Sequence, residues 1–334
     1  MNLRTLFLAS TTIAIAAPAL ADINIYTPRQ PELIQPVMDA FTAETGIAVN
    51  LAFVDDGLVE RLKAEGRRSP ADLVMTVDIA NLQQIVDADV IQAVESDVLT
   101  ASIPPALRDS DNLWFGLTTR ARIIYASRDR VAEGEVTTYE DLADPKWAGR
   151  ICTRSGLHNY NLALMSAVIA HVGEEGAAAW AEGVHSNLAR KPEGNDRAQV
   201  KAIWAGECDI SLGNTYYMGK MLANEEQIPW ADSVRIVFPE FANGGSHVNV
   251  SGVAMTKAAP NRDEAVQLME YLVSPAAQAI YAELNFEYPV LESAALSDLV
   301  TSWGEMTADT TDLTEIAGHR AAALRIMEEV DFDG

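Results

Sequence analysis

The sequence predicts an α/β protein folded as two lobes. Three observations lead to this prediction. Short apolar strands alternate with amphipathic helices from residue 23 onward, a second alternating set begins after Trp114, and 334 residues are enough for two separate hydrophobic cores. Apolar residues make up 49% of the chain, which excludes wholesale disorder. The βαβα order of the first set predicts a mostly parallel sheet with helices on both faces.

The first alternating set lies in the N-terminal part of the chain. Ile23–Thr27 has the composition of a strand, and Leu33, Val37, Met38 and Phe41 then recur at helical spacing. The predicted elements that follow are a strand at Ala48–Phe53, a helix at Leu58–Glu65, a strand at Asp72–Thr76 and a helix at Ile79–Val86. Ligands of open α/β sheets bind outside the carboxyl ends of the strands, so a site is expected in the segments that follow strands.

The second set is followed by a mainly helical C-terminal part. Its predicted elements are a strand at Ile123–Ser127, helices at Asn161–His171, Glu174–Val184 and Gln199–Ala205, and strands at Cys208–Leu212, Val234–Phe238 and Val248–Thr256. Asn261 with Glu264 has the spacing of a capping box, and Ser274 caps a helix that begins with Pro275. A last helix is predicted at Leu313–Glu328.

The first 21 residues have the pattern of a secretory signal peptide. Arg4 is their only charge, an apolar stretch runs from Leu6 to Ala17, and the segment ends in a small-x-small cleavage signal at 19–21. The stretch is too short for a membrane-spanning helix, and the alternative is a buried N-terminal helix. We expect a mature chain that starts near Asp22 and works in the periplasm.

The charge and the missing motifs exclude several classes of function. The formal net charge is −24, and loss of Arg4 with the signal peptide would make it −25, a field that repels nucleic acids and anionic lipid surfaces. The sequence has no G-x-S-x-G, H-E-x-x-H or P-loop motif. Its histidines are scattered at His158, His171, His185, His247 and His319. We therefore expect no enzyme, and we expect His247 to make local hydrogen bonds at the start of a strand.

The chain has two cysteines, Cys152 and Cys208. An even count in an exported protein favours a disulfide, and each cysteine borders a short apolar run, so the two could be neighbours in one lobe. The alternative is a pair of buried free thiols. A redox or metal role is disfavoured because the spacing is not C-x-x-C.

Tyrosines stand at two predicted strand-to-helix corners. Tyr216 and Tyr217 follow the strand Cys208–Leu212 and a short turn, and Tyr160 follows the turn at Ser155-Gly156. Adjacent residues inside a helix point about 100° apart, but at such a corner they can converge. Phenolate is an anionic oxygen donor, so three converging phenols would suit a hard trivalent cation. The alternative is that these tyrosines pack at helix starts with their hydroxyls in water.

Three phenolates would leave coordination positions that a small bidentate anion such as carbonate could fill. Arginine has the forked donors that such an anion needs. The candidates are Arg29 and the pair Arg120 and Arg122, of which one is expected to face solvent. Backbone N–H groups near Ser155-Gly156 could also donate to the anion.

Several stretches taken together resemble the periplasmic ferric-ion-binding proteins of bacterial ABC transporters, over almost the whole chain after residue 21. They are Tyr-Thr-Pro-Arg-Gln-Pro (26–31), Trp-Phe-Gly-Leu-Thr-Thr-Arg-Ala-Arg (114–122), Asn-Leu-Ala-Arg-Lys-Pro-Glu-Gly-Asn-Asp (187–196), Gly-Asn-Thr-Tyr-Tyr-Met-Gly-Lys (213–220), and shorter matches at 69–72, 251–257 and 287–290. The resemblance implies the type II periplasmic-binding-protein fold: two lobes, each a mixed sheet flanked by helices, with the ligand in the cleft between them. The lobes expected are an N-lobe at 22–118 plus 253–310 and a C-lobe at 119–252, with a C-terminal helical segment at 311–334.

The resemblance also implies a set of site residues. The family's three iron-binding tyrosines correspond to Tyr160, Tyr216 and Tyr217, and its anion-holding arginines to Arg29 and Arg120. A branch of the family has similarly placed cysteines, which supports the disulfide. The implied cargo is Fe³⁺ with carbonate, bicarbonate or a similar small anion, and the implied partner is an ABC-transporter permease in the inner membrane. The protein is expected to be a monomer.

One departure from the family concerns a ligand from the N-lobe. A branch of the family has His-Tyr where this chain has Gln30-Pro31, and another has a tyrosine where this chain has Pro28. We therefore expect three tyrosines with an anion or water, and Asp55 or Asp56, which otherwise belong to a turn, as a further candidate. Two competing hypotheses are the same scaffold binding a small organic or anionic solute, and a secreted iron enzyme that uses His158 as a base.

Overall fold

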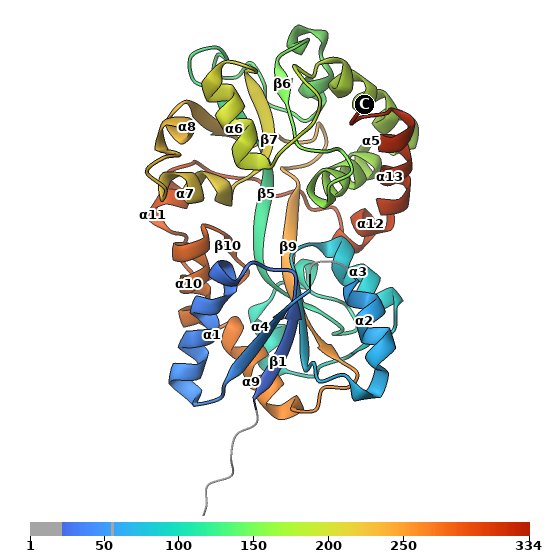
Figure 1. The fold of residues 1–334 in the computed structure, drawn as a ribbon, viewed down its shortest axis with the longest axis vertical. Coiled ribbons are helices and arrows are strands. Elements are labelled where there is room, and N and C mark those ends of the chain that lie inside the picture. The colour runs from blue at the N-terminus through green and yellow to red at the C-terminus, as the bar shows by residue number, and fades with distance from the viewer. Residues whose placement is uncertain (1–21, 55–56) are drawn as a thin grey trace, which may run out of the picture.

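The computed structural model describes residues 22–54 and 57–334. The predicted signal peptide and the candidate ligands Asp55 and Asp56 lie outside these residues. Within them, the chain forms two α/β lobes that are joined by long strands, as Figure 1 shows.

The N-lobe, drawn in the lower half of Figure 1, combines the start of the chain with a later segment. Its elements are β1 (Ile23–Thr27), α1 (Pro31–Thr45), β2 (Val49–Phe53), α2 (Leu58–Glu65), β3 (Leu73–Thr76), α3 (Ile79–Asp87), β4 (Ile91–Gln92), α4 (Asp97–Ser102), α9 (Arg262–Leu272), α10 (Pro275–Asn285) and β10 (Tyr288–Pro289). A core of aliphatic and aromatic side chains that includes Ile25, Phe41 and Met269 lies between its sheet and helices.

The C-lobe occupies the upper half of the same view. Its elements are β6 (Ile151–Cys152), α5 (Asn159–Ser186), α6 (Asp196–Ala205), β7 (Ile210–Asn214), α7 (Tyr216–Leu222), α8 (Ile228–Asp232), β8 (Val234–Val237), α11 (Asp298–Thr301), α12 (Leu313–Gly318) and α13 (Arg320–Glu329). The helices α12 and α13 pack against α5, and α12 also contacts α3 of the N-lobe. The lobe boundaries stay a prediction, and Trp303 and Met306 pack against the C-lobe cluster around Cys152.

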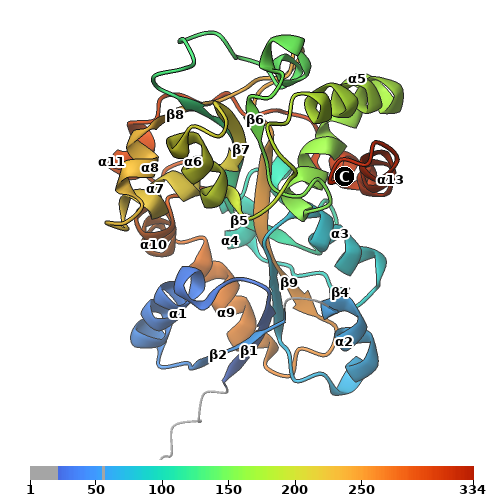
Figure 2. The same cartoon turned by 45° about the horizontal axis from the view of Figure 1, so that its top comes forward.

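Two antiparallel strands run from one lobe into the other (Figures 1 and 2). They are β5 (Phe115–Ser127) and β9 (Val248–Thr256), paired from Phe115–Val253 to Ala121–Val248. At one end they pair with β10, β3 and β4, and at the other end β5 pairs with β7 and β8. All residues of both strands are buried, so this joint is part of the protein interior.

The prediction of a mostly parallel sheet for the first alternating set is confirmed for β1, β2 and β3, but the sheets also contain antiparallel strands from later in the chain. β1 pairs in parallel with β2 and β3, and β6 with β7, but every pairing of β5 and β9 is antiparallel. The reason is that β5 and β9 cross between the lobes in opposite directions, so β9 runs against β3 in the N-lobe and β5 runs against β7 in the C-lobe. The sheets are mixed, as the type II architecture requires.

The two helices predicted at Asn161–His171 and Glu174–Val184 are confirmed: both lie in α5, which has a kink with non-helical backbone at Gly173, φ 72°. Two other helix predictions differ from the structure in detail. The last predicted helix is broken into α12 and α13 at His319. Asn261 makes no side-chain cap, whereas Ser274 accepts a hydrogen bond from the N–H of Ala277 at the start of α10.

The structure pairs Cys152 with Cys208 in a disulfide, with Cα atoms 5.9 Å apart. The bond links β6 to the residues just before β7 and lies in an apolar cluster with Val200 and Met218. Among the described residues, no helix is long and apolar enough to span a bilayer.

Candidate metal centre

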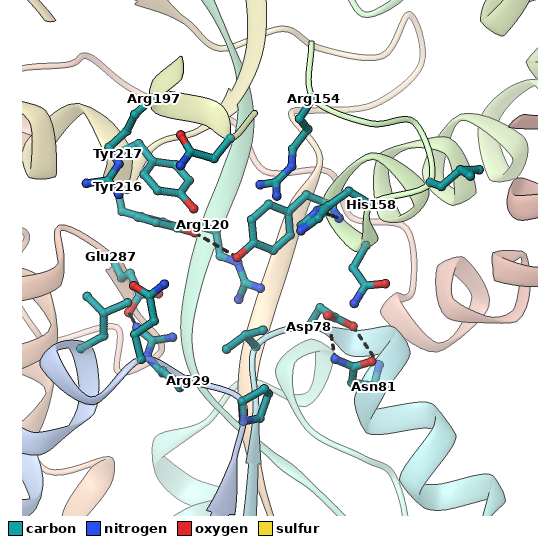
Figure 3. A pocket seen from close by; sticks show the side chains of 18 residues that line it. Arg29, Asp78, Asn81, Arg120, Arg154, His158, Arg197, Tyr216, Tyr217 and Glu287 are labelled. Carbon is teal, nitrogen blue, oxygen red and sulfur yellow. Dashed lines mark hydrogen bonds and ion pairs between the residues drawn. The ribbon is translucent and has the colours of Figure 1, made fainter. Parts of the chain in front are cut away.

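A cleft of about 510 Å³ lies between the lobes. The five predicted metal- and anion-binding residues all line it: Arg29, Arg120, Tyr160, Tyr216 and Tyr217. Figure 3 shows Tyr216 and Tyr217 on the C-lobe side, and Arg29, Asp78 and Glu287 on the N-lobe side. The residues that sequence analysis gathered from distant segments are therefore close together in space.

The three tyrosines converge from two helix starts. Tyr160 lies in the first turn of α5, and Tyr216 and Tyr217 are the first two residues of α7, directly after β7. The hydroxyl oxygens of Tyr160 and Tyr216 are 3.2 Å apart, and the ring centres of Tyr216 and Tyr217 are 4.4 Å apart. The strand-to-helix corner turns adjacent side chains toward one space.

Burial keeps Tyr216 and Tyr217 neutral in the absence of a cation. Desolvation raises the pKa of Tyr216 well above its usual value, and the neighbouring Tyr160 and Tyr217 raise this pKa further. The pKa of Tyr217 is raised mainly by burial and then by the charge of Asp196. A trivalent cation favours the phenolate strongly enough to displace such protons, so the cluster is suited to a highly charged metal ion.

Arginines lie next to the tyrosine rings. The guanidinium carbon of Arg154 is 5.1 Å from the ring centre of Tyr160, and that of Arg197 is 6.0 Å from the ring centre of Tyr217. Positive charge at this distance favours the ionised phenol. Both arginines line the cleft, and sequence analysis missed both. The position of Arg154 directly before the Ser155-Gly156 turn was the signal that could have indicated it.

The two predicted anion-binding arginines share one hydroxyl. Arg29 donates to Ser251 Oγ at 2.9 Å and Arg120 donates to the same oxygen at 3.0 Å. Arg29 also forms a buried ion pair with Glu287, with an N–O distance of 2.5 Å. Sequence analysis did not assign Glu287 to the site. Because Glu287 already neutralises Arg29, Arg120 is the more available donor for an anion in the cleft.

The expectation that Arg120 or Arg122 faces solvent is wrong, because both are 3% exposed. Residues two apart in a strand point to the same face, and on this face of β5 both side chains are buried. Arg122 donates to Asp196 at 2.6 Å and to Asn161 at 2.7 Å. It therefore belongs to a buried network behind the tyrosines and does not line the cleft.

The backbone donors predicted near Ser155-Gly156 are already used. The N–H of Gly156 donates to Asp333 at 2.7 Å, and the hydroxyl of Ser155 donates to the same carboxylate at 2.5 Å. Neither Ser155 nor Gly156 is among the residues that line the cleft. In this structure, the prediction that this turn holds the anion of the metal site is therefore wrong.

The prediction for His247 is half right. Its backbone N–H donates to the hydroxyl of Tyr139 at 2.9 Å, but neither ring nitrogen has a hydrogen-bond partner. Burial lowers its pKa to about 3, so the ring is neutral. His158 also has a pKa lowered to about 4, mainly by burial, and its Nδ1 accepts from the N–H of Tyr160 at 3.1 Å. Neither histidine carries charge at neutral pH.

The donor set of the cleft differs from a transition-metal site based on histidine and cysteine. Among the described residues, no group of three or more His, Cys, Asp or Glu side chains could hold a metal ion. The cleft instead combines three phenols with four arginines and two carboxylates. Oxygen donors in a positively charged cleft suit a hard cation that arrives with an anion.

Comparison with known proteins agrees with this geometry. The family model for bacterial extracellular solute-binding proteins matches residues 37–308. The chain is 46% identical over 314 residues to Iron uptake protein A1 of Synechocystis, a match that spans 93% of this chain and 87% of that protein.

Solved structures with the same architecture include iron-binding proteins. The apo ferric ion-binding protein A of Pasteurella haemolytica superposes with a TM-score of 0.91 at 50% identity, covering 95% of this chain and 99% of that one. The Trichodesmium FutA (IdiA) protein, solved in complex with iron and citrate, superposes with a TM-score of 0.88 at 41% identity, covering 93% of this chain and 99% of that one.

Proposed function

The chain belongs to the family of bacterial extracellular solute-binding proteins, and we propose that it binds Fe³⁺ in the periplasm and delivers it to an ABC-type permease in the inner membrane. The observation that carries this proposal is the convergence of three phenols in one cleft, with the hydroxyls of Tyr160 and Tyr216 3.2 Å apart. Relatives that are described as iron-uptake and ferric-binding proteins support it.

Tyr160, Tyr216 and Tyr217 bind the ion as phenolates in this proposal. Together they neutralise its charge, and their oxygens match the preference of a hard cation. A small anion such as carbonate completes the coordination, held by Arg120 and, where Glu287 releases it, by Arg29. The positive charges of Arg154, next to the Tyr160 ring, and Arg197, next to the Tyr217 ring, favour the ionised phenols.

The protein acts as a carrier and not as an enzyme. His158, the one histidine considered as a base, has its Nδ1 engaged by the N–H of Tyr160 and a pKa of about 4. Closure of the lobes around iron would give the permease a shape that differs from that of the empty protein. We expect a monomer in solution.

An absorption titration of the metal-stripped protein with ferric citrate, with and without bicarbonate, tests the proposal. We expect a purple-red charge-transfer band that saturates at about one iron per chain, since phenolate ligands give such a band. The double variant Tyr216→Phe, Tyr217→Phe removes two hydroxyls without removing the rings, so it should fold and lose the band. A folded wild-type protein without a band would favour an organic or anionic solute instead.

A further inference from the structure

The turn before α5 binds a carboxylate that comes from the other end of the sequence. Asp333 accepts the hydroxyl of Ser155 at 2.5 Å and the N–H of Gly156 at 2.7 Å. The Ser155 hydroxyl oxygen in turn accepts the N–H of Leu157 at 3.1 Å. Hydrogen bonds to an ionised carboxylate are about twice as strong as neutral ones. One carboxylate therefore orders three successive residues of the turn.

Packing brings Asp333 to this turn. Phe332 is 3% exposed and belongs to the core that includes α5 and α13. Gly156 is small enough for close contact, because a Cβ at this position would lie 2.6 Å from the Phe332 ring. The segment after α13 is thus anchored by its aromatic residue, and the next residue places its carboxylate against the turn.

The same turn carries part of the metal centre on its other side. Arg154, which precedes it, lies 5.1 Å from the Tyr160 ring centre, and His158, which follows it, has its ring 4.7 Å from that of Tyr160. His158 also accepts the N–H of Tyr160 through Nδ1. A displacement of the turn would therefore move three residues that line the cleft: Arg154, His158 and Tyr160.

The turn is held from both sides. On the inner side, the side-chain amide of Asn161 donates to the carbonyl oxygens of Arg154 and Ser155, at 3.0 Å each. On the outer side, Asp333 accepts from Ser155 and Gly156. The side chain of Asn161 is a neutral amide, so only the hydrogen bonds to Asp333 involve a carboxylate.

We propose that Asp333 is a positioning residue for the metal centre, because it supplies from within the chain the carboxylate that orders the Ser155-Gly156 turn and so holds Tyr160. Without it, the N–H of Gly156 loses its partner and the turn loosens at the point where α5 begins. The link to metal affinity rests on the proposed iron function. The ordering of the turn does not, and it can be measured without iron.

The test is Asp333→Ala in the full mature chain, with sodium formate as a replacement for the missing carboxylate. Ferric citrate competition, read by the charge-transfer band at constant bicarbonate, should show about tenfold weaker iron binding. Hydrogen exchange at Gly156 and Leu157 in the metal-free protein should be at least about tenfold faster, because these amides lose their ordered partners. Formate should reverse both changes in the variant, and sodium chloride at the same concentration should not.

Asp331→Asn is the matched control. It removes one negative charge from the same segment, and asparagine tolerates the left-handed backbone at this exposed position, φ 52°. It should leave iron binding and exchange unchanged. Asp333→Asn, which keeps one acceptor oxygen in place, should fold and show a smaller loss, so it decides the matter if Asp333→Ala does not fold.

Two results would overturn the proposal. Wild-type affinity and amide protection in the Asp333 variants would show that the contact orders nothing. A loss that formate does not reverse would show that Asp333 acts only through packing. A wild-type protein that binds no iron would instead refute the proposed function, and the exchange measurement would still test the role of Asp333.

Discussion

At the scale of single residues, burial and charge oppose each other in the cleft. Burial raises the pKa of Tyr216 and Tyr217 and so disfavours the phenolates that a metal needs. Arg154 and Arg197 next to the rings favour ionisation and offset part of this cost. In the proposed function the cation supplies the remainder, so we expect the site to select a highly charged ion.

Iron binding should therefore release about three protons per ion near neutral pH, one from each phenol. The sign follows from the raised pKa values of Tyr216 and Tyr217: these two phenols are fully protonated in the empty protein, so each phenolate formed there expels a whole proton. Affinity should accordingly fall as the pH falls, by up to about tenfold per pH unit for each phenolate. A weakly buffered titration with a pH indicator measures the release.

Tyr160→Phe is the control for this measurement. It keeps the ring and removes one ionisable hydroxyl, so the release should drop to about two protons per iron. The same release from the variant and the wild type would mean that Tyr160 stays protonated or does not bind the ion.

The tyrosines were predictable because local sequence patterns mark their positions. No local pattern marks the roles of Glu287, Asp333 and Arg122. A strand followed by a turn and a helix start is visible in sequence, and it indicated Tyr216, Tyr217 and Tyr160. Glu287 and Asp333 find their partners 258 and 177 residues away, through packing that no local pattern encodes. Arg122 was misjudged because its partner, Asp196, is likewise distant in sequence.

At the scale of elements, α7 connects the tyrosines to the N-lobe. Gly219, one turn after Tyr216, faces Phe286, and a Cβ there would lie 2.3 Å from the aromatic ring. On the same helix, Lys220 donates to the carbonyl oxygen of Leu284 at 2.7 Å. The position of α7, and with it that of the two tyrosines, depends on close contact with the end of α10.

Gly219→Ala should therefore destabilise the protein by about 1–3 kcal/mol, since the added methyl must displace a packed ring. It should also weaken iron binding by shifting Tyr216 and Tyr217. Gly318→Ala, in α12 with open space around the position, is the control and should be neutral or up to about 1 kcal/mol stabilising. Urea unfolding measures both, and equal stability of the two variants would contradict the proposed contact.

Helices and strands were predictable from the sequence where a single hydrophobic pattern determined them. The strands β1, β3 and β7 match their predictions to within a residue or two, because each is a short apolar run bounded by polar residues. The 13-residue strand β5 was predicted only in its last five residues. Its first half contains Thr118, Thr119 and Arg120, which are polar but buried where the lobes join. A buried strand is usually apolar, and β5 departs from this pattern where it passes between the lobes next to the candidate site.

At the scale of the whole molecule, the net charge of the protein is negative, whereas the local charge of the cleft is positive. The chain carries a formal net charge of −24, whereas the cleft is lined by four arginines and two carboxylates. The screening length is about 30 Å at 0.01 M salt and about 8 Å at 0.15 M. An anionic ferric chelate is thus repelled by the whole protein at low salt. At physiological salt it meets mainly the nearby field of the cleft.

The rate of iron uptake from ferric citrate should therefore increase as sodium chloride rises from about 10 to about 150 mM, because screening removes the distant repulsion before it removes the attraction in the cleft. Stopped-flow absorbance in the charge-transfer band gives this rate. Arg197→Gln should slow uptake most at the higher salt concentration, where the field of the cleft dominates. Arg67→Gln changes an exposed arginine that is not among the lining residues and should not slow uptake. Ferric nitrilotriacetate carries less charge and should show a weaker salt dependence. A rate that falls with salt would mean that the arginines already steer the chelate from a distance, against the net charge of the protein.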